Sequence, residues 1–235
     1  MKICMIGAGY VGLVSAACFS EFGWEVACVD KDPHRLDELN AGRSPIYEPG
    51  LDDLMQRNMK AGRLTFTANL KDAVKGAAVV FLAVGTPMRR GDGYADLSHV
   101  YGAVEELAPF LESFAVITTK STVPVGTSRE IERRVAALRP DLEFAVCSNP
   151  EFLREGSAIQ DFTHPDRVLV GTDSDKAREV LGRLYAPLNL RGSPVIFVTR
   201  ESAELAKYAA NAFLALKISF INEIADLSEQ VGGDV

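Results

Sequence analysis

Short apolar runs rich in Val, Ile and Phe alternate with longer segments of helical periodicity along most of the 235-residue chain. This alternation is typical of a parallel sheet covered by helices on both faces. The strands that it predicts cover residues 2–6, 25–30, 78–83, 114–118, 143–147, 167–170 and 194–198. The helices between them cover residues 11–22, 33–40, 51–61, 70–75, 97–111, 127–138 and 175–185. The pattern therefore predicts an α/β fold with a doubly wound, mainly parallel sheet.

A different pattern fills the C-terminal part of the chain. From Glu201 to about Val231 no proline or glycine interrupts a stretch whose apolar residues wrap nearly all the way around a helix. Thr199 is a suitable N-cap, and Glu201 in the first turn suits the positive end of the helix dipole. Gly232 and Gly233 end the helical pattern. We expect one long, buried helix.

The charge balance limits the possible partners. The chain carries 25 basic and 32 acidic residues, a net charge of -7, which argues against sequence-independent binding to nucleic acid or to an anionic membrane. The first apolar run ends at Gly7, too early for a signal peptide or a membrane span. We expect a cytoplasmic protein.

Cysteine and histidine are too scattered for a metal or redox site. None of the four cysteines forms a pair with metal or redox spacing, and the three histidines lie far apart in the sequence. The four cysteines are Cys4, Cys18, Cys28 and Cys147. We expect them to be reduced and mostly buried, and we expect no metal.

A glycine-rich turn follows the first predicted strand. Gly7, Gly9 and Gly12 form the pattern GxGxxG between a strand and a helix. In a Rossmann-like fold the first glycine allows the tight turn, the second lets the backbone approach a pyrophosphate, and the third permits close packing of helix on strand. The predicted helix begins at Val11, directly after Tyr10, and its free N–H groups favour phosphate. The turn predicts a dinucleotide site, although glycines also gather in ordinary turns.

Asp30 lies at the end of the second predicted strand, eighteen residues after Gly12. There its carboxylate can accept hydrogen bonds from the adenosine ribose, and it would repel a 2′-phosphate, so NAD is favoured over NADP. Lys31 and Arg35 lie nearby, and a cation in this place can also bind a phosphate.

Three further segments follow predicted strands, where a doubly wound sheet gathers its ligands. They cover residues 85–87 with Thr86, residues 120–126 with Thr122, and residues 149–156 with Glu151 and Glu155. Each is also consistent with ordinary turn chemistry, because Gly, Pro, Ser and Asn occur in any loop. Their coincidence at strand ends favours a ligand site.

Together these segments resemble the UDP-glucose/GDP-mannose dehydrogenase family. Seven motifs carry the resemblance, in order along the whole chain: GAGYVGLV (7–14), SPIYEPGL (44–51), VGTP (84–87), KSTVPVGT (120–127), SNPEFLREGSAIQDF (148–162), PDRVLVG (165–171) and ELAKYAANAFLALKISFINE (204–223). The family oxidises the primary alcohol of a nucleotide sugar to a carboxylate with two NAD in succession, through covalent intermediates on a cysteine.

The resemblance implies roles for residues of this chain. Lys207 and Asn211, four apart on one helix face, would hold the oxyanion at C6 of the sugar. Glu151 would act as a base or order a water with Thr122. The segment Glu151, Phe152, Leu153, Arg154 and Glu155 would contact the sugar nucleotide, with Glu155 and Thr122 also near NAD. The cofactor would be held by Gly7, Gly9, Tyr10, Val11, Gly12, Asp30, Arg35 and Thr86.

Simpler roles for these charged residues stay open. Lys207 can extend its ammonium to solvent or pair with Glu204. The carboxylates Glu151 and Glu155 can belong to a solvated loop or a helix cap.

The family's catalytic cysteine lies in a segment reading GGSCFPKD, which this chain does not contain. We therefore expect the N-terminal part of such an enzyme, able to bind NAD but not to complete the oxidation. Residues 1–199 would form the NAD-binding domain, and residues 200–235 the long helix that starts a central domain and pairs two chains as a homodimer. The UDP-binding C-terminal domain would be absent.

Alternative functions remain. The motif FLREG favours UDP-glucose as substrate, but GDP-mannose and UDP-N-acetyl sugars are alternatives within the family. A hydroxyacid dehydrogenase shares the fold and a lysine with an asparagine four residues on, although it lacks SPIYEPG and NPEFLREG in this form. A non-catalytic NAD-binding assembly module is the third possibility, because the apolar helix suits a dimer interface.

Overall fold

Eight strands form one central sheet in the order β3-β2-β1-β4-β5-β6-β7-β8. The structure is a computed structural model that describes residues 1–234. The strands are β1 (Lys2–Ile6), β2 (Glu25–Val29), β3 (Leu64–Thr67), β4 (Val79–Leu82), β5 (Ala115–Thr119), β6 (Phe144–Ser148), β7 (Val168–Gly171) and β8 (Val195–Val198). All neighbouring strands are parallel except β6 and β7, which meet antiparallel at Ser148 and Gly171. The predicted doubly wound, mainly parallel sheet is confirmed.

Helices connect the strands. They are α1 (Tyr10–Glu21), α2 (Pro33–Asn40), α3 (Leu51–Lys60), α4 (Leu70–Val74), α5 (Ser98–Leu107), the 3-10 turn η1 (Ala108–Phe110), α6 (Thr127–Leu138), α7 (Ala158–Thr163), α8 (Asp175–Leu184), α9 (Ala186–Asn189) and α10 (Arg200–Gln230). The helix predicted over residues 97–111 ends as an α-helix before Pro109, whose ring and missing N–H interrupt the α-helical pattern.

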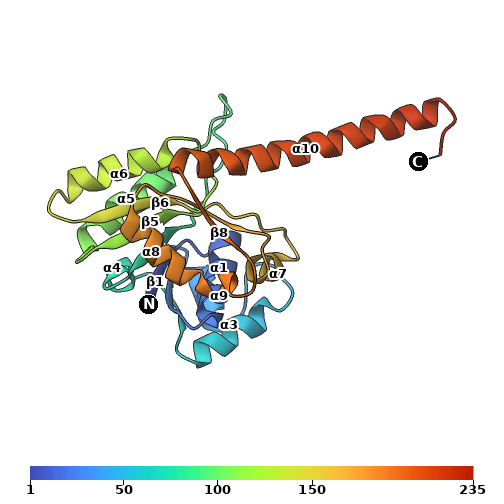
Figure 1. Cartoon of the computed structure of the whole chain (residues 1–235). Coiled ribbons are helices and arrows are strands. Elements are labelled where there is room, and N and C mark those ends of the chain that lie inside the picture. Colours follow the sequence, from blue (N-terminus) through green and yellow to red (C-terminus); the bar gives the residue numbers. More distant parts are fainter. Residues whose placement is uncertain (235) are drawn as a thin grey trace.

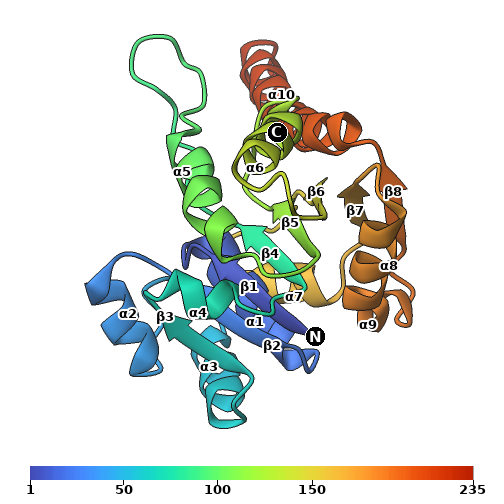
Figure 2. The ribbon, with the colours of Figure 1, turned by 90° about the vertical axis from the view of Figure 1, so that its left-hand side faces the viewer.

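Apolar side chains leave both faces of the sheet, and each face carries its own core. On β4, Val79 and Phe81 belong to one core, whereas Val80 and Leu82 belong to the other. The first core is closed by α1, α3, α7 and α8, and the second by α4, α5 and α6. Figure 2 shows these helices on the two sides of the sheet. A parallel strand buried on both faces explains why the predicted strands are apolar runs without alternation.

Three short elements were not predicted from the sequence. Strand β3 has four residues at the edge of the sheet, with alternating buried and exposed positions and two threonines. Helices α7 and α9 have six and four residues, too few to show a helical period. Their recognition requires the contacts that they make after the chain has folded.

The prediction of a buried C-terminal helix is wrong for most of α10. The helix begins after the predicted N-cap Thr199, whose side chain accepts a hydrogen bond from Ser202 N. Arg200, Ala203, Glu204 and Lys207 are buried, and the rest of α10 projects away from the sheet (Figure 1). The exposed apolar side chains of this outer part are Tyr208, Phe213, Leu214, Leu216, Ile218, Phe220, Ile221, Ile224 and Leu227. A helix that is apolar all around is normally buried against other segments, and no other segment of residues 1–234 packs against this part of α10.

The carboxyl ends of β1, β2, β4, β5 and β6 share one edge of the sheet, because these strands are parallel. The glycine turn, Asp30 and the segments 85–87, 120–126 and 149–156 follow these strand ends. The order of connection reverses between β1 and β4, and doubly wound folds bind their ligands outside such a reversal. The fold therefore gathers the predicted site residues at one edge.

Candidate functional site

The glycine turn after β1 has the geometry of a phosphate-binding loop. Gly7 has a φ of +103°, and a Cβ on it would lie 2.5 Å from the carbonyl oxygen of Ala83. A Cβ on Gly12 would lie 1.9 Å from the carbonyl oxygen of Gly7. A Cβ on Gly9, in contrast, would meet no other part of the described chain within 4 Å, and its φ of -74° suits any residue. Gly7 and Gly12 are thus required by the fold, whereas Gly9 leaves open space in front of the turn.

The first turn of α1 faces this open space. Helix α1 begins at Tyr10 after the N-cap Gly9, which has no side chain to cap it. The N–H groups of such an uncapped first turn favour an anion. Val11, in this turn, is partly exposed. The arrangement suits the pyrophosphate of a dinucleotide.

Asp30 follows β2 and lies beside the glycine turn. Its carboxylate accepts hydrogen bonds from Ala8 N at 2.8 Å, from Asp32 N at 3.0 Å and from Arg35 Nη1 at 3.0 Å. Burial raises the pKa of Asp30, but these donors outweigh burial and hold it below its ordinary value. The carboxylate therefore stays ionised and keeps lone pairs for a ribose hydroxyl.

The two cations near Asp30 are both in ion pairs. Arg35 binds Asp30 itself, and Lys31 Nζ binds Glu106 Oε1 at 2.5 Å. Neither points a free charge at the place of a 2′-phosphate in this structure. The arrangement favours NAD over NADP, as Asp30 alone already predicts.

Thr86 and Thr122 come together although they follow different strands. The Thr86 hydroxyl donates a hydrogen bond to the Thr122 carbonyl oxygen at 2.9 Å. Thr86 follows β4, which borders the topological reversal, and Thr122 follows the neighbouring strand β5. The two predicted cofactor residues therefore form one small polar cluster.

Lys207 and Glu151 form a buried ion pair. Lys207 Nζ lies 3.0 Å from Glu151 Oε1, and the side chains are 9% and 12% exposed. Glu151 Oε2 accepts a hydrogen bond from Leu153 N at 2.6 Å. The Lys207 ammonium also lies over the Phe152 ring, 5.4 Å from its centroid. The interpretation of Lys207 as a partner of Glu204 is thereby wrong.

Glu204 has another role. Its carboxylate accepts hydrogen bonds from Gly126 N at 2.7 Å, Ser128 N at 2.8 Å and the Ser128 hydroxyl at 2.6 Å. These groups lie at the start of α6, where a negative charge is favourable. Glu204 therefore anchors the first turns of α10 to the domain and brings Lys207 to Glu151. Asn211, one turn beyond Lys207, is exposed.

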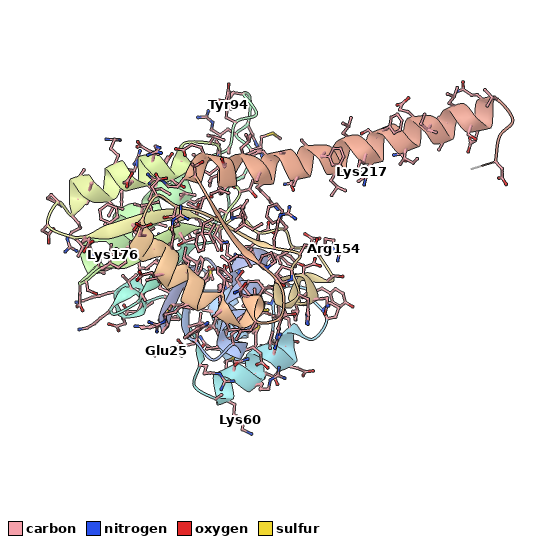
Figure 3. The ribbon with its side chains drawn as sticks, viewed as in Figure 1. Glu25, Lys60, Tyr94, Arg154, Lys176 and Lys217 are labelled. Carbon is pink, nitrogen blue, oxygen red and sulfur yellow. The ribbon has the colours of Figure 1, made fainter. Side chains whose placement is uncertain are left out.

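The segment after Glu151 is held by the helix that follows it. Arg154 donates to Asp161 through its backbone N–H at 2.9 Å and through its guanidinium at 2.7 and 3.1 Å. The Arg154 side chain is otherwise at the surface, below the middle of α10 in Figure 3. Glu155 is exposed, and the cations of Lys207 and Arg167 each lie 5.4 Å from the centroid of the Phe152 ring.

This segment borders a cavity of about 530 Å³, a volume within the range of small-molecule sites. Its walls are formed by residues 149–154, by residues from α7 to the start of β7, and by Lys120, Tyr185 and Leu188. Glu151, Phe152, Leu153 and Arg154 all line it. Four of the predicted substrate residues therefore face one cavity.

Lys120 is a functional candidate that the sequence pattern did not single out. Its ammonium is buried, donates to Asn149 Oδ1 at 2.9 Å, and lies 5.7 Å from the ring centroids of Phe81 and Phe162. The Tyr185 hydroxyl donates to the same Asn149 oxygen. Burial lowers the pKa of Lys120 to about 8, with the Glu151 carboxylate opposing the shift. The lysine in KSTVPVGT was visible in the sequence, but its burial was not.

Glu48 is a second missed residue. It is 6% exposed and lies in the loop before α3. Its carboxylate accepts hydrogen bonds from the Tyr10 hydroxyl at 2.8 Å, from Gly156 N at 2.9 Å and from Ala158 N at 2.8 Å. The motif SPIYEPG contains this glutamate, but nothing in the sequence gave its partners. Tyr10, predicted beside the cofactor, thus directs its hydroxyl towards Glu48.

The four cysteines are free and buried, as predicted. Burial raises the pKa of Cys147 to about 11 and that of Cys4 to about 12, so both stay as unreactive thiols. Among residues 1–234, no three His, Cys, Asp or Glu side chains gather in a way that could hold a metal ion. No helix in that range is long and apolar enough to cross a membrane.

Comparison with known proteins agrees with this geometry. The family model of the UDP-glucose/GDP-mannose dehydrogenase family, NAD binding domain, matches residues 1–189, and the model of the family's central domain matches residues 201–235. A UDP-glucose 6-dehydrogenase of Rhizobium meliloti is 58% identical over 237 residues, which cover 100% of this chain and 54% of the relative. The chain spans about half the length of the curated relatives it matches.

Two solved structures resemble the chain closely. A GDP-mannose dehydrogenase from Pseudomonas aeruginosa, in a ternary complex, has a TM-score of 0.95 and 35% identity, covering 100% of this chain and 54% of that one. A UDP-glucose dehydrogenase from the archaeon Pyrobaculum islandicum has a TM-score of 0.94 and 40% identity, covering 99% of this chain and 54% of that one. Both are dehydrogenases that share the sheet and its flanking helices.

Proposed function

The chain belongs to the UDP-glucose/GDP-mannose dehydrogenase family, and on this premise we propose that it serves the NAD-dependent oxidation of UDP-glucose to UDP-glucuronate. The observation that carries the proposal is the buried pair of Lys207 and Glu151, whose charged atoms are 3.0 Å apart and whose Glu151 lines the cavity. A buried ammonium held by one carboxylate is suited to stabilise an oxygen that becomes negative during alcohol oxidation.

We propose that NAD binds with its pyrophosphate over Gly9 and against the first turn of α1. The open space at Gly9, where a Cβ would meet nothing, supports this placement. Asp30 would receive the adenosine ribose, with Arg35 holding the carboxylate, and Tyr10 and Val11 would border the phosphates. Thr86 and Thr122 would lie against the more distant part of the cofactor. NAD supplies the acceptor of the hydride.

We propose that the sugar lies between the ion pair and the segment of residues 151–155. Lys207 and Asn211 would hold the oxygen at C6, and Glu151 would take its proton or order a water together with Thr122. Phe152, Leu153, Arg154 and Glu155 would position the sugar nucleotide. The cavity that four of the five segment residues line supports this assignment.

The cysteine nucleophile of this reaction would come from outside residues 1–235. The four cysteines of the chain are buried in the Rossmann-like domain and have raised pKa values, which supports this expectation.

We divide the chain into an NAD-binding domain, residues 1–199, and a helix, residues 200–235, that starts the central domain.

The exposed apolar surface of α10 supports a homodimer formed through this helix. The four free thiols support a reducing compartment, the cytoplasm.

Two measurements test the proposed function. Titration of the 235-residue chain with NADH, followed by NADH fluorescence, is expected to show saturable binding. The chain is then joined at residue 235 to the remaining part of the Rhizobium meliloti relative and assayed with UDP-glucose, GDP-mannose, a UDP-N-acetyl sugar and a small hydroxyacid. Oxidation of UDP-glucose with two NADH formed per sugar is the expected result.

Two results would contradict the proposal. Turnover of another substrate but not of UDP-glucose would refute the substrate assignment. Substantial turnover of UDP-glucose by the 235-residue chain alone would refute the placement of the nucleophile outside it.

A further inference from the structure

Glu48 joins two segments that lie far apart in the sequence. Its Oε2 accepts hydrogen bonds from the Tyr10 hydroxyl and from Gly156 N, and its Oε1 accepts from Ala158 N and, at 3.4 Å, from Ile159 N. The first partner starts α1 directly after Gly9, and the others lie directly after the substrate segment 151–155. A single buried carboxylate thus connects the glycine turn with the end of that segment.

Tyr10 makes the connection twofold. Its hydroxyl lies 2.8 Å from Glu48 Oε2 and 3.0 Å from the carbonyl oxygen of Arg154. Burial and the Glu48 hydrogen bond raise the pKa of Tyr10 above its ordinary value, so the hydroxyl remains a proton donor near neutral pH. Because Tyr10 is the first residue of α1, any shift of the glycine turn moves this hydroxyl.

Glu48 also replaces a missing helix cap. Ser157, the N-cap residue of α7, makes no capping hydrogen bond through its side chain. The N–H groups of Ala158 and Ile159 in the first turn of α7 point instead to Glu48 Oε1. Without this carboxylate, the first turn of α7 and Gly156 lose the acceptor that fixes them, and the segment before them loses its anchor.

We propose that Glu48 and Tyr10 are positioning residues which tie the substrate segment 151–155 to the cofactor turn, so that NAD binding orders the place where the sugar binds. The inference rests on the proposed NAD site at Gly9. When the cofactor restrains the glycine turn, it also restrains the position of Tyr10. Through the hydrogen bonds of Glu48, this restraint extends to residues 154–159. Glu48 touches neither ligand in this scheme.

Hydrogen exchange of the 235-residue chain tests the coupling. Amide exchange of peptides that cover residues 154–159 is followed by mass spectrometry with and without saturating NADH. In the unmodified chain NADH is expected to slow this exchange about tenfold, a size typical of coupled sites. In Glu48→Gln, which keeps the size of the side chain, the slowing is expected to fall below about twofold, while NADH still binds.

A matched control and a second variant keep the test decisive. Tyr47→Phe removes a hydroxyl from the neighbouring residue, which is 87% exposed, and is expected to keep the full slowing. Tyr10→Phe removes only the shared hydroxyl, and it is expected to reduce the slowing even if Glu48→Gln fails to fold.

The possible failures differ in meaning. If the unmodified chain does not bind NADH, the proposed function fails at its cofactor. If NADH binds but leaves the exchange of residues 154–159 unchanged, the coupling is refuted and the proposed function stands. The role of this pair would also be refuted if NADH slowed the exchange of a folded Glu48→Gln protein as much as that of the unmodified chain. If Glu48→Gln does not fold, the same result in Tyr10→Phe would refute it.

Discussion

Replacing Lys120 by methionine is expected to stabilise the chain near neutral pH, although it removes a residue from the site. The side chain is buried, and within residues 1–234 its ammonium has one hydrogen-bonding partner, Asn149 Oδ1. The ring centroids of Phe81 and Phe162 each lie 5.7 Å from the ammonium. The charged groups that face it are Glu151, which favours the ammonium, and Lys207, which opposes it. Methionine has a similar volume and needs no partner.

The magnitude follows from the pKa of Lys120. Its fall from 10.5 to about 8 means that folding disfavours the charged form by about 3 kcal/mol. Replacing the lysine by methionine removes this cost, but it also removes the hydrogen bond to Asn149, which lowers the gain in stability by about 1 kcal/mol. Asn149 Oδ1 still accepts a hydrogen bond from Tyr185. We expect the free energy of unfolding of Lys120→Met to exceed that of the unmodified chain by about 2 kcal/mol at about pH 7.

The sign of the pH dependence is fixed by which state binds more protons. Below pH 8 the lysine is charged in the folded and the unfolded chain, so the full cost is present. Between about 8 and 10.5 the unfolded chain binds more protons than the folded one, so the stability contributed by this group rises with pH. By about pH 9.5 the difference between the two proteins is expected to approach zero.

Urea unfolding at about pH 7 and about pH 9.5 measures both differences. Lys60→Met, an exposed lysine at the end of α3, is the control, and we expect it to change the free energy of unfolding by less than about 0.5 kcal/mol at either pH. A Lys120→Met protein that is less stable than the unmodified chain by the same amount at both pH values would refute the reasoning. It would mean that Glu151 and Asn149 compensate the buried charge completely.

Three further predictions concern other parts of the molecule. Gly9→Ala is expected to fold and to weaken NADH binding about tenfold or more. Gly12→Ala, whose Cβ would lie 1.9 Å from Gly7 O, is instead expected to lower the melting temperature strongly. Circular dichroism combined with NADH titration distinguishes the two variants, and unchanged NADH binding by Gly9→Ala would place the phosphates elsewhere. Glu204→Gln is expected to lower the free energy of unfolding, measured by urea unfolding, by about 1–3 kcal/mol, because a charged acceptor of three hydrogen bonds at the start of α6 is lost. An unchanged unfolding curve would contradict the role of Glu204 in anchoring α10. The double variant Phe213→Arg, Phe220→Arg is expected to abolish concentration-dependent association in sedimentation velocity, since both side chains are more than half exposed on α10; association that persists would exclude this surface as the interface.

The features that could be predicted are those that the local sequence encodes. The apolar runs of seven strands and the apolar period of most helices predicted the mainly parallel sheet, because burial of a strand such as β4 on both faces demands an unbroken apolar run. The structural roles of Gly7 in the tight turn and of Gly12 in close packing were predicted correctly, because a close approach of two backbones leaves no room for a Cβ. Thr199 was identified as the N-cap of α10 for a similar reason, since a cap acts within one turn.

The partners of the charged side chains could not be predicted in this way. Lys207 has Glu204 within one helical turn, yet it pairs with Glu151, because Glu204 is already bound to the start of α6. Such choices depend on distances between elements that only packing creates. The same holds for Glu48, whose partners in α1 and before α7 are remote in sequence.

By itself, the sequence determined an NAD-binding α/β domain and a long helix after it, and it predicted the edge of the sheet at which the proposed ligands gather, since each follows from short-range periodicity and from backbone space. Only the tertiary structure decided that Lys120 is buried and lines the cavity, that Glu48 connects Tyr10 with Gly156 and Ala158, and that the outer part of α10 is exposed rather than buried. The physical reason is that burial and ion pairing are properties of neighbours in space, and an apolar or charged residue does not specify which neighbour it will have.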